Sequence, residues 1–429
     1  MIILCDPQCK GIMHEKINSG FIKGFRLAYP NSKIIFFAHA THITAVKDIF
    51  RSNEIEIENI EYQPIDFETQ MTKIYCFSGI IRYFYLLKKI FNRILAEKSS
   101  KIFFLSNNPI ILCALKILKQ RARYKNICCS VVLHGEFENI GKTDTLINQS
   151  DDENPKKIIK KWLDRLANFL KRLSKKIFQP LTSGRIIYSL AFKKIFSVKR
   201  MMLWRHSGHY KYIALSSHIL DNAQNYLDVK RLNFQVVTMP IIFSKIDTSS
   251  HNDFIKFAIF GSGDEKQLLR LLTALSQRKI TKPYEIRIIS LNDQGTEGFK
   301  NVTRVRQGEI LTRKEMEDQL PDIDIFINLY DSTRYKLSCS ASIFEAFAYF
   351  KPVLHLNNDC YNYYNQPERP IGYRCDSFNE YVKKMQELIE NYSLYQDQFK
   401  IFRKNILVCR QEYAIENNLE SLKKSFDFS

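Results

Sequence analysis

The segment that decides the fold is Asp322–Asn358, DIDIFINLYDSTRYKLSCSASIFEAFAYFKPVLHLNN. It opens with a short apolar run, DIFINLY (324–330), which has the length of a buried strand. A polar loop follows, and then an apolar-rich segment around 343–349 that we expect to be a helix. Pro352 ends that helix and opens a second apolar run, PVLHLN (352–357). A strand, a helix and a second strand in this order predict the repeating unit of a parallel sheet.

The same alternation extends from this segment in both directions. In the second half of the chain we expect further strands at 254–263 and 284–290, and helices at 265–277, 313–319, 378–391 and 395–428. In the first half we expect strands at 2–5, 33–40, 55–60, 101–106, 127–136, 212–217 and 234–240, with helices at 17–29, 46–50, 80–95 and 110–118. Near-continuous apolar strands separated by helices predict parallel sheets that are covered on both faces.

The chain of 429 residues is too long for one ordinary core, and the alternation restarts near its middle. We therefore predict an α/β protein of two Rossmann-like domains whose parallel sheets face each other across a cleft. The expected domains are residues 1–240, with an insertion at about 150–205, and residues 254–429, joined by a linker at 241–253. Ligands of such sheets bind at the carboxyl ends of the strands, so the cleft is the expected site.

Composition narrows the class of protein and its compartment. Hydrophobic residues make up 45% and charged residues 25% of the chain, which is typical of a folded protein. The N-terminal MIILCDPQCK lacks the features of a signal peptide, and no apolar stretch reaches the roughly 20 residues of a membrane span. We therefore expect a cytoplasmic protein. The ten cysteines include no Cys-x-x-Cys, which favours reduced thiols, and no metal site is expected.

The net charge of +19 is concentrated between Lys156 and Arg200, where fourteen Lys or Arg residues stand against one acidic residue. Within that stretch, residues 156–178 carry apolar and basic residues at helical spacing. The predicted helix has Trp162, Leu166 and Phe169 on its apolar side and Lys160, Lys161 and Lys171 on its basic side. Such a helix suits an anionic membrane surface, and packing against the domain is the alternative. No nucleic-acid-binding module is visible, so nucleic acid is not an expected partner.

The segment Asp322–Asn358 resembles the donor-binding signature of GT-B glycosyltransferases, nearest to glycosyltransferase family 4 and the related group 1-like bacterial polysaccharide enzymes. The resemblance runs through the acidic-apolar strand, the polar loop, the helix with Glu345-Ala346 and the strand opened by Lys351-Pro352-Val353. Together with FAIFGSGDEK (257–266) and the first half of the chain, it covers most of the sequence in order. It implies that the C-terminal domain binds a nucleotide-sugar donor and the N-terminal domain an acceptor.

The expected donor site combines a helix N-terminus with a glycine turn. A helix N-terminus presents N–H groups and a positive dipole end to a diphosphate, and serines add hydroxyl donors. The resemblance implies that Glu345 accepts hydrogen bonds from the ribose. The predicted donor-binding residues are Gly261, Ser262, Gly263, Lys266, Ser338, Ser340, Ser342 and Glu345. A serine-capped helix and an ordinary strand-to-helix turn are the alternatives that need no ligand.

Three positions depart from the family pattern. Retaining members carry a glutamate eight positions before the counterpart of Glu345, where this chain has Leu337. Phe350 stands in place of a glycine, and Ser262 in place of an arginine. Whether a reaction would retain or invert the anomeric configuration, and whether the site is active, therefore stays open.

On the acceptor side, His134-Gly135-Glu136 ends an apolar strand at the predicted cleft. A histidine or carboxylate in that place can take the proton of an acceptor hydroxyl. In retaining relatives a histidine here contacts the donor sugar instead, and a polar strand end without chemistry is the third possibility. The predicted catalytic residues are His134 and Glu136, and the predicted acceptor or cleft residues are His14, Lys16, Ser19, Gly20, His39 and His42.

Together these features predict a glycosyltransferase that moves a sugar from a nucleotide-sugar to a glycan or lipid-linked acceptor in bacterial surface polysaccharide synthesis. The expected partners are the nucleotide-sugar substrate, that acceptor and the anionic inner face of the cell membrane. No cofactor is required, because a helix N-terminus and a lysine can stabilise the leaving diphosphate. A sugar-nucleotide epimerase of the same fold and a catalytically inactive GT-B scaffold are the alternatives.

Overall fold

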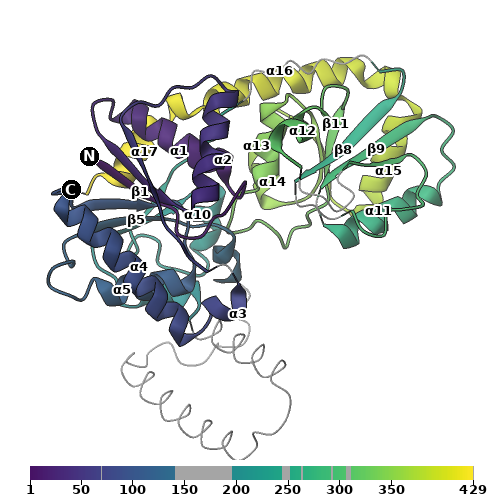
Figure 1. Ribbon diagram of the computed structural model, residues 1–429. Helices are drawn as coiled ribbons and strands as arrows, with labels where there is room; N and C mark the ends of the chain where they lie inside the picture. The colour runs from purple at the N-terminus through teal and green to yellow at the C-terminus, as the bar shows by residue number, and fades with distance from the viewer. Residues whose placement is uncertain are drawn as a thin grey trace, which may run out of the picture.

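The computed structural model describes residues 1–68, 70–140, 196–243, 252–261, 264–290, 293–305 and 311–428. Several predictions lie outside the described residues. They are the basic amphipathic helix with Trp162, Leu166, Phe169, Lys160, Lys161 and Lys171, the donor residues Ser262 and Gly263, and most of the linker. The described residues form two α/β domains side by side, which confirms the predicted fold class (Figure 1).

The N-terminal sheet has seven parallel strands in the order β3-β2-β1-β4-β5-β6-β7. The strands are β1 (Ile2–Cys5), β2 (Ile34–Ala38), β3 (Ile60–Pro64), β4 (Lys101–Phe104), β5 (Cys128–Val132), β6 (Tyr210–Ala214) and β7 (Phe234–Val236). The central strands are buried along their length, because helices cover the sheet on both faces. The order doubles back beside β1, as in Rossmann folds, and this places the loops after β1 and β4 next to each other.

Eight helical segments among the described residues connect these strands. They are α1 (Glu15–Ala28), α2 (Ala40–Ser52), α3 (Met71–Ile74), α4 (Phe77–Ala96), α5 (Pro109–Leu118), η1 (Gly135–Glu138), α9 (Val198–Leu203) and α10 (Ser217–Ala223). Local sequence explains the start of α5. For α5, the side chain of Asn108 accepts hydrogen bonds from the backbone N–H groups of Ile110 and Ile111, and Pro109 occupies the first turn, where no N–H partner is needed.

One predicted strand of this domain is wrong. Residues 55–60, where isoleucine and glutamate alternate, were expected to form a strand, but the strand β3 spans Ile60–Pro64. Glu54 and Asn59 both have positive φ angles, of 54° and 52°, so the backbone bends at each end of the alternating segment. Pairing with β2 begins only at Ile60, which lies opposite Ile34.

The C-terminal sheet has six parallel strands in the order β10-β9-β8-β11-β12-β13. They are β8 (Ile255–Gly261), β9 (Tyr284–Ser290), β10 (Val302–Arg304), β11 (Ile325–Asn328), β12 (Val353–Leu356) and β13 (Gly372–Cys375). The helical segments are α11 (Glu265–Ser276), α12 (Arg313–Glu317), α13 (Ala341–Ala348), α14 (Asp359–Tyr364), α15 (Phe378–Glu390) and η3 (Tyr392–Tyr395). The segment Asp322–Asn358 supplies β11, α13 and β12, as its pattern predicts.

The end of the chain returns to the N-terminal domain. Helix α16 (Gln396–Tyr413) runs back from the second sheet, and η4 (Ile415–Asn417) and α17 (Leu419–Phe426) follow it (Figure 1). Phe426 is buried edge-on against Phe25 of α1, with ring centroids 5.3 Å apart. Ser130 of β5 donates a hydrogen bond to the backbone oxygen of Ser425. The predicted range 254–429 therefore includes a helix that packs on the first sheet.

Candidate active site

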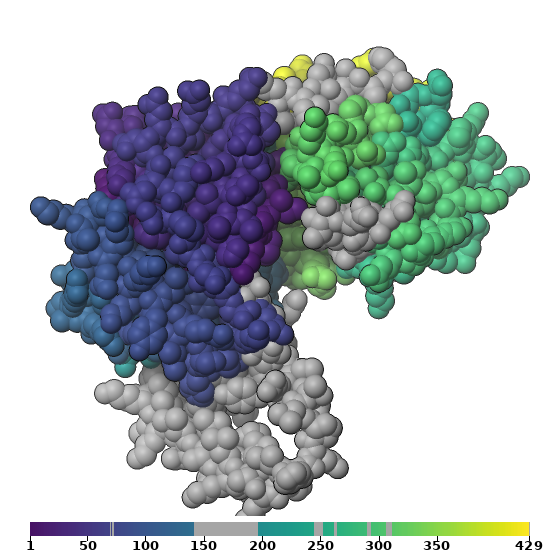
Figure 2. Space-filling view, in the orientation of Figure 1, coloured from purple at the N-terminus to yellow at the C-terminus, as the bar shows by residue number. Residues whose placement is uncertain are grey.

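The two sheets meet at the carboxyl ends of their strands. Lys16, in the first turn of α1 after β1, donates a hydrogen bond of 2.7 Å to Glu345 of α13. Glu138, which follows β5, accepts a hydrogen bond of 2.7 Å from the backbone N–H of Leu337, which follows β11. Since α1 and η1 follow strands of the first sheet, and residues 337 and 345 follow β11, these contacts join the two carboxyl edges. We call this contact between the two domains, which includes Lys16–Glu345 and Glu138–Leu337, the seam. Figure 2 shows the domains in contact.

A buried carboxylate organises the loop between β1 and α1. Asp6 accepts hydrogen bonds from the backbone N–H groups of Gln8 and Cys9, at 3.0 and 2.8 Å, and from the side chains of Asn18 and Ser106. Burial alone would raise the pKa of Asp6, but the neighbouring His42 and the hydrogen bonds outweigh burial and lower it. Asp6 is therefore an ionised anchor that fixes the loop 6–14.

Two histidines lie against each other, with tilted rings, at the end of this loop. His14 precedes α1 in the left-handed conformation, with φ 54° and ψ 21°, and its ring centroid lies 4.5 Å from that of His134. His134 Nε2 lies 2.7 Å from the carbonyl oxygen of Leu105. Because a carbonyl oxygen only accepts, Nε2 carries the proton and Nδ1 is the basic nitrogen.

Burial keeps both imidazoles neutral. Burial, followed by the nearby His134, lowers the pKa of His14 to about 3. Burial also lowers the pKa of His134. A neutral imidazole with an unprotonated nitrogen can accept a proton from a hydroxyl group, which is the chemistry of a general base. The structure thus brings the predicted residues His14 and His134 together at the carboxyl edge of the first sheet.

The other residues predicted on this side have different surroundings. His42 is fully buried, with Nδ1 2.8 Å from Gly11 O and Nε2 2.7 Å from the side-chain amide of Asn18. His39 is partly exposed and caps α2, where its side chain accepts from the N–H of Thr41. Glu136 accepts a hydrogen bond of 3.2 Å from the Tyr75 hydroxyl.

The burial of Ser19 and Gly20 does not support their prediction as cleft residues. The Ser19 hydroxyl donates to the backbone oxygen of Glu15 within α1. A Cβ atom at Gly20 would overlap the carbonyl oxygen of Pro240, so α1 packs against the chain there without space for a side chain. Both positions are buried.

Glu345 lies in a buried cluster of charges shared by the two domains. Lys16 Nζ lies 2.7 Å from Glu345 Oε2 and 2.9 Å from the Tyr349 hydroxyl, while Arg313 of α12 lies 3.1 Å from Glu345 Oε1. Arg313 also contacts Glu15 of α1 at 3.3 Å. Both carboxylate oxygens of Glu345 are therefore engaged, and the side chain is only 8% exposed.

Charge balance in this cluster keeps Glu345 ionised. Burial alone would raise the pKa of Glu345, but Arg313 and then Lys16 outweigh burial, so the pKa is lowered. For Lys16 burial is the larger influence and lowers the pKa. Ribose binding by Glu345 was predicted from the resemblance. The described contacts show an ion pair between the predicted cleft residue Lys16 and the predicted donor residue Glu345, and ribose binding stays a prediction.

The N-terminus of α13 carries the predicted serines. Ser340 is the N-cap residue, but its side chain makes no capping bond and lies 3.2 Å from the Tyr361 hydroxyl. Ser338 donates to Glu138 at 2.9 Å, and Ser342 lies 3.4 Å from the backbone oxygen of Phe260. No described side chain therefore caps the N–H groups of the first turn of α13, which is the electrostatic environment that anions favour.

The glycine turn after β8 contributes less. Gly261 ends β8, and Asp264 caps α11 by accepting from the N–H of Gln267. Lys266 is exposed in the first turn of that helix. No described contact joins Lys266 to the charge cluster or to α13.

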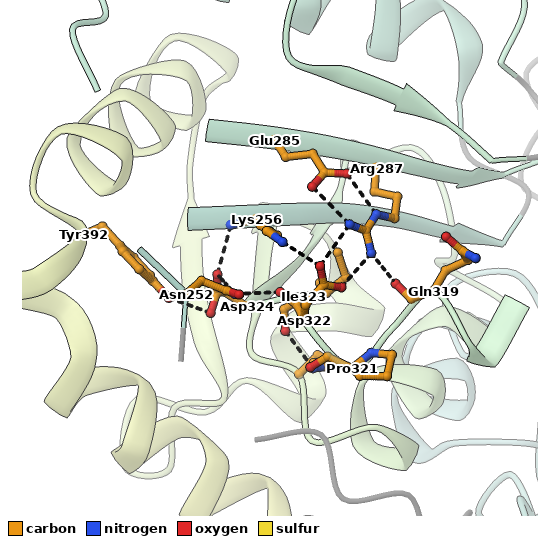
Figure 3. A network of polar contacts seen from close by, with 11 residues as sticks. Asn252, Lys256, Glu285, Arg287, Gln319, Pro321, Asp322, Ile323, Asp324 and Tyr392 are labelled. Carbon is orange, nitrogen blue, oxygen red and sulfur yellow. Dashed lines mark hydrogen bonds and ion pairs between the residues drawn. The ribbon is translucent and has the colours of Figure 1, made fainter. Parts of the chain in front are cut away.

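The Asp322-Ile323-Asp324 sequence has a structural role. Asp322 pairs with Lys256 and Arg287 at 2.6 Å each (Figure 3). Burial would raise the pKa of Asp322, but Arg287 and Lys256 outweigh burial and lower it to about 2. Asp324 accepts hydrogen bonds from Asn252 and from the Tyr392 hydroxyl. These residues lie at the amino ends of β8, β9 and β11, which is the edge of the sheet away from the seam.

Within the part of the chain that the structure describes, no cluster of His, Cys, Asp or Glu suits a metal ion.

Two residues that the sequence analysis did not single out belong to the seam. Arg313 has a local signal, because Thr312 and Glu315 form a capping box that marks the start of α12. Glu138 lies two residues after the predicted Glu136, and no sequence pattern marks it.

Among the described residues, no helix has the length and apolar character needed to cross a membrane.

The arrangement of two Rossmann domains with facing carboxyl edges is the GT-B fold, and comparison with solved structures agrees. The chain is similar to a glycosyltransferase from Rickettsia africae ESF-5, with 10% identity, 99% of this chain and 98% of that chain covered, and a TM-score of 0.55. The Anabaena protein Alr3699/HepE in complex with UDP-glucose matches at 11% identity, 99% and 98% coverage and a TM-score of 0.55. The apo form of the lipopolysaccharide outer core galactosyltransferase WaaB matches at 11% identity, 99% and 98% coverage and a TM-score of 0.52.

These likenesses show the fold over nearly the whole chain. They confirm the predicted GT-B fold, while the nearer resemblance to family 4 stays a prediction. No protein-family model matches the sequence, and no curated protein matches it.

Proposed function

We propose that this protein is a glycosyltransferase that moves a sugar from a nucleotide-sugar donor to a hydroxyl group of an acceptor. The observation that carries the proposal is the seam itself. The neutral pair His14 and His134 lies at the carboxyl edge of one sheet, and the uncapped N-terminus of α13 lies at the carboxyl edge of the other. Transfer of a sugar with a diphosphate leaving group needs two elements, a base and a site that binds an anion. The histidines supply the first and the helix end supplies the second.

In the proposed reaction, the acceptor oxygen attacks the anomeric carbon of the donor sugar. The bond between that carbon and the diphosphate oxygen breaks, and the nucleoside diphosphate leaves with the electron pair. Nδ1 of His134 takes the proton of the acceptor hydroxyl, because Nε2 is held by Leu105 O. The leaving diphosphate lies against the N–H groups of α13, whose dipole favours the developing negative charge. A single displacement of this kind inverts the anomeric configuration.

Glu345 can still contact a ribose in this proposal. A carboxylate has about four lone-pair positions, and Lys16 and Arg313 engage one oxygen each. The ion pairs would then hold the carboxylate in a fixed direction while it accepts from the ribose hydroxyls. The solved Anabaena complex contains UDP-glucose, which supports testing uridine nucleotides first.

The proposal is tested with a panel of nucleotides. UDP, GDP, dTDP and CMP are added in turn to the full chain, and the melting temperature is measured. A nucleotide at a hundred times its dissociation constant stabilises the protein by about 2.7 kcal/mol. We expect one of the four nucleotides to raise the melting temperature more than the others. If none of the four raises the melting temperature, the donor assignment fails.

Turnover then separates a transferase from the alternatives. We expect His134→Ala to lower transfer of sugar by about 10²- to 10⁴-fold while the affinity for the nucleotide stays the same. Glu136→Ala is compared in parallel. An epimerase would change the donor sugar without an acceptor, and an inactive scaffold would bind the nucleotide without product.

We further propose a lipid-linked or glycan acceptor of a bacterial surface polysaccharide, with the enzyme on the cytoplasmic face of the membrane. The support is the basic amphipathic sequence at 156–178, which lies outside the described residues. Each Lys or Arg near an anionic surface contributes about 1 kcal/mol to binding. Replacing Trp162 and Phe169 with Ser should release the protein from vesicles of anionic lipid without lowering its melting temperature. A fall in melting temperature with vesicle binding retained would mean that this segment packs in the core.

A further inference from the structure

The loop that leads into α13 is held by a residue of the opposite domain. This loop, residues 335–338, is called the donor loop below. The carboxylate of Glu138 in η1 accepts a hydrogen bond of 2.7 Å from the N–H of Leu337 and one of 2.9 Å from the Ser338 hydroxyl. A charged acceptor makes such bonds short and directional. Glu138 thus ties the end of β5 to the loop after β11.

Two further side chains of the first domain hold the same loop, and both come from α10. His218 Nε2 lies 3.2 Å from the backbone oxygen of Tyr335 and 3.3 Å from that of Ser338. Carbonyl oxygens only accept, so Nε2 carries the proton, and Nδ1 lies 2.8 Å from the Ser216 hydroxyl. Asn222 donates to the backbone oxygen of Lys336 at 2.9 Å.

These contacts fix the path of the donor loop, because most of them go to its backbone. Each of its four residues offers one backbone N–H or C=O group to the first domain. Tyr335 has a φ angle of 55°, a left-handed conformation that a bulky side chain adopts only where the surroundings impose it. The loop runs directly into Ser340, the N-cap residue of α13.

We infer that Glu138, His218 and Asn222 are positioning residues for the nucleotide-sugar, although they belong to the acceptor-side domain. They set the conformation of the donor loop and so the direction of the α13 N–H groups that receive the diphosphate. The donor site is complete only when the two domains are engaged. This inference rests on the proposed function, and it adds that donor affinity depends on side chains of the first domain.

The test measures nucleotide affinity in full-length variants. UDP, GDP, dTDP and CMP are titrated by calorimetry into the wild type, and the tightest binder is then titrated into the variants Glu138→Ala, Glu138→Gln and Asn222→Ala. The matched control is Glu416→Gln. It removes a half-exposed carboxylate that pairs with Lys23 of α1, outside the donor loop.

We expect Glu138→Ala to weaken nucleotide binding at least about tenfold, because the Leu337 N–H and the Ser338 hydroxyl lose a charged acceptor. Glu138→Gln should stay within about threefold of the wild type, since its amide oxygen can accept both hydrogen bonds. Asn222→Ala should weaken binding by about threefold or more. Glu416→Gln should bind as the wild type does. Rescue by glutamine distinguishes positioning of the loop from a general loss of stability.

Three results would overturn this inference. One is a folded Glu138→Ala variant with wild-type affinity. Another is a Glu138→Gln variant as weak as the alanine variant. If Glu138→Ala does not fold, unchanged affinity in Asn222→Ala, whose side chain lies at the surface edge of the loop, would count against it equally. A wild type that binds none of the four nucleotides would instead remove the proposed function, which distinguishes the two failures.

Discussion

At the scale of single residues, the seam depends on the ion pair between Lys16 and Glu345. Lys16→Met removes one of two cations that face the buried Glu345 carboxylate and leaves Arg313 to balance it. Breaking a buried pair from one side typically costs about 3–5 kcal/mol. We expect a loss near the lower end of that range, measured as the free energy of unfolding in urea at pH 7.5, because Arg313 remains.

The control for this prediction is the double variant. Adding Glu345→Gln to Lys16→Met removes the unpaired charge, so part of the lost stability should return. If the two single losses simply add in the double variant, Lys16 and Glu345 are not coupled, and the ion pair contributes nothing to the seam.

The partly buried His14 predicts how stability depends on pH. The pKa of His14 is about 3 in the folded chain, below the ordinary 6.5. Below pH 6.5 the unfolded chain therefore binds a proton that the folded chain does not, so stability falls as the pH falls from 6.5 towards 3. One such group contributes a slope of about 1.4 kcal/mol per pH unit in that window.

The measurement compares unfolding at pH 7.5, 6 and 5 in the wild type and in His14→Gln. The variant lacks the titrating group, so its loss of stability between pH 6 and pH 5 should be smaller by about 1 kcal/mol. Parallel curves for the two proteins would show that His14 is not held neutral by its surroundings.

Position after a strand was enough to predict part of the site, but not its contacts. His14 and His134 were predicted because each follows a strand of the first sheet, and the structure places their rings 4.5 Å apart. The contact of Lys16 with Glu345 spans 329 positions in sequence, and no local pattern encodes a distance across two domains. Glu345 was therefore predicted as a ribose ligand without its partners.

At the scale of elements, periodicity predicted helices better than short strands. Helix α13 was predicted at 343–349 from the apolar run that follows the polar loop, and it spans Ala341–Ala348. The alternation at 55–60 was misleading, because period-two spacing needs a neighbouring strand before it becomes a sheet. The backbone bends at residues 54 and 59, and pairing with β2 begins only at Ile60.

Helix α1 gives a prediction at this scale. Gly20→Ala would place a Cβ atom against the backbone of Pro240 and Ile241, and a backbone cannot rotate away as a side chain can. Overpacking of this kind typically costs about 1–3 kcal/mol, which we expect as a lower free energy of unfolding. Gly208→Ala is the control, because open space surrounds that position. Equal stability of both variants would show that α1 can shift to accept the methyl group.

At the scale of the whole molecule, the C-terminal end of the chain packs on the N-terminal domain. The two-domain plan was predictable because the strand-and-helix alternation restarts after the linker. The return of α17 to the first sheet was not, because a helix near the end of a chain carries no signal for the surface it will cover. Phe426 and Ser425 acquire their contacts with Phe25 and Ser130 only in the folded chain.

This return predicts that a residue near the C-terminus stabilises the N-terminal domain. Phe426 is 4% exposed and packs on Phe25 and Tyr29 of α1, so Phe426→Ala should cost about 3–5 kcal/mol. Leu394→Ala, at a side chain that is 78% exposed, is the control. Hydrogen exchange resolves which domain responds. We expect the amides of β4 and β7, which α17 contacts, to exchange faster in Phe426→Ala, while those of β8 and β9 change little. Faster exchange confined to β8 and β9 would place the role of α17 in the second domain.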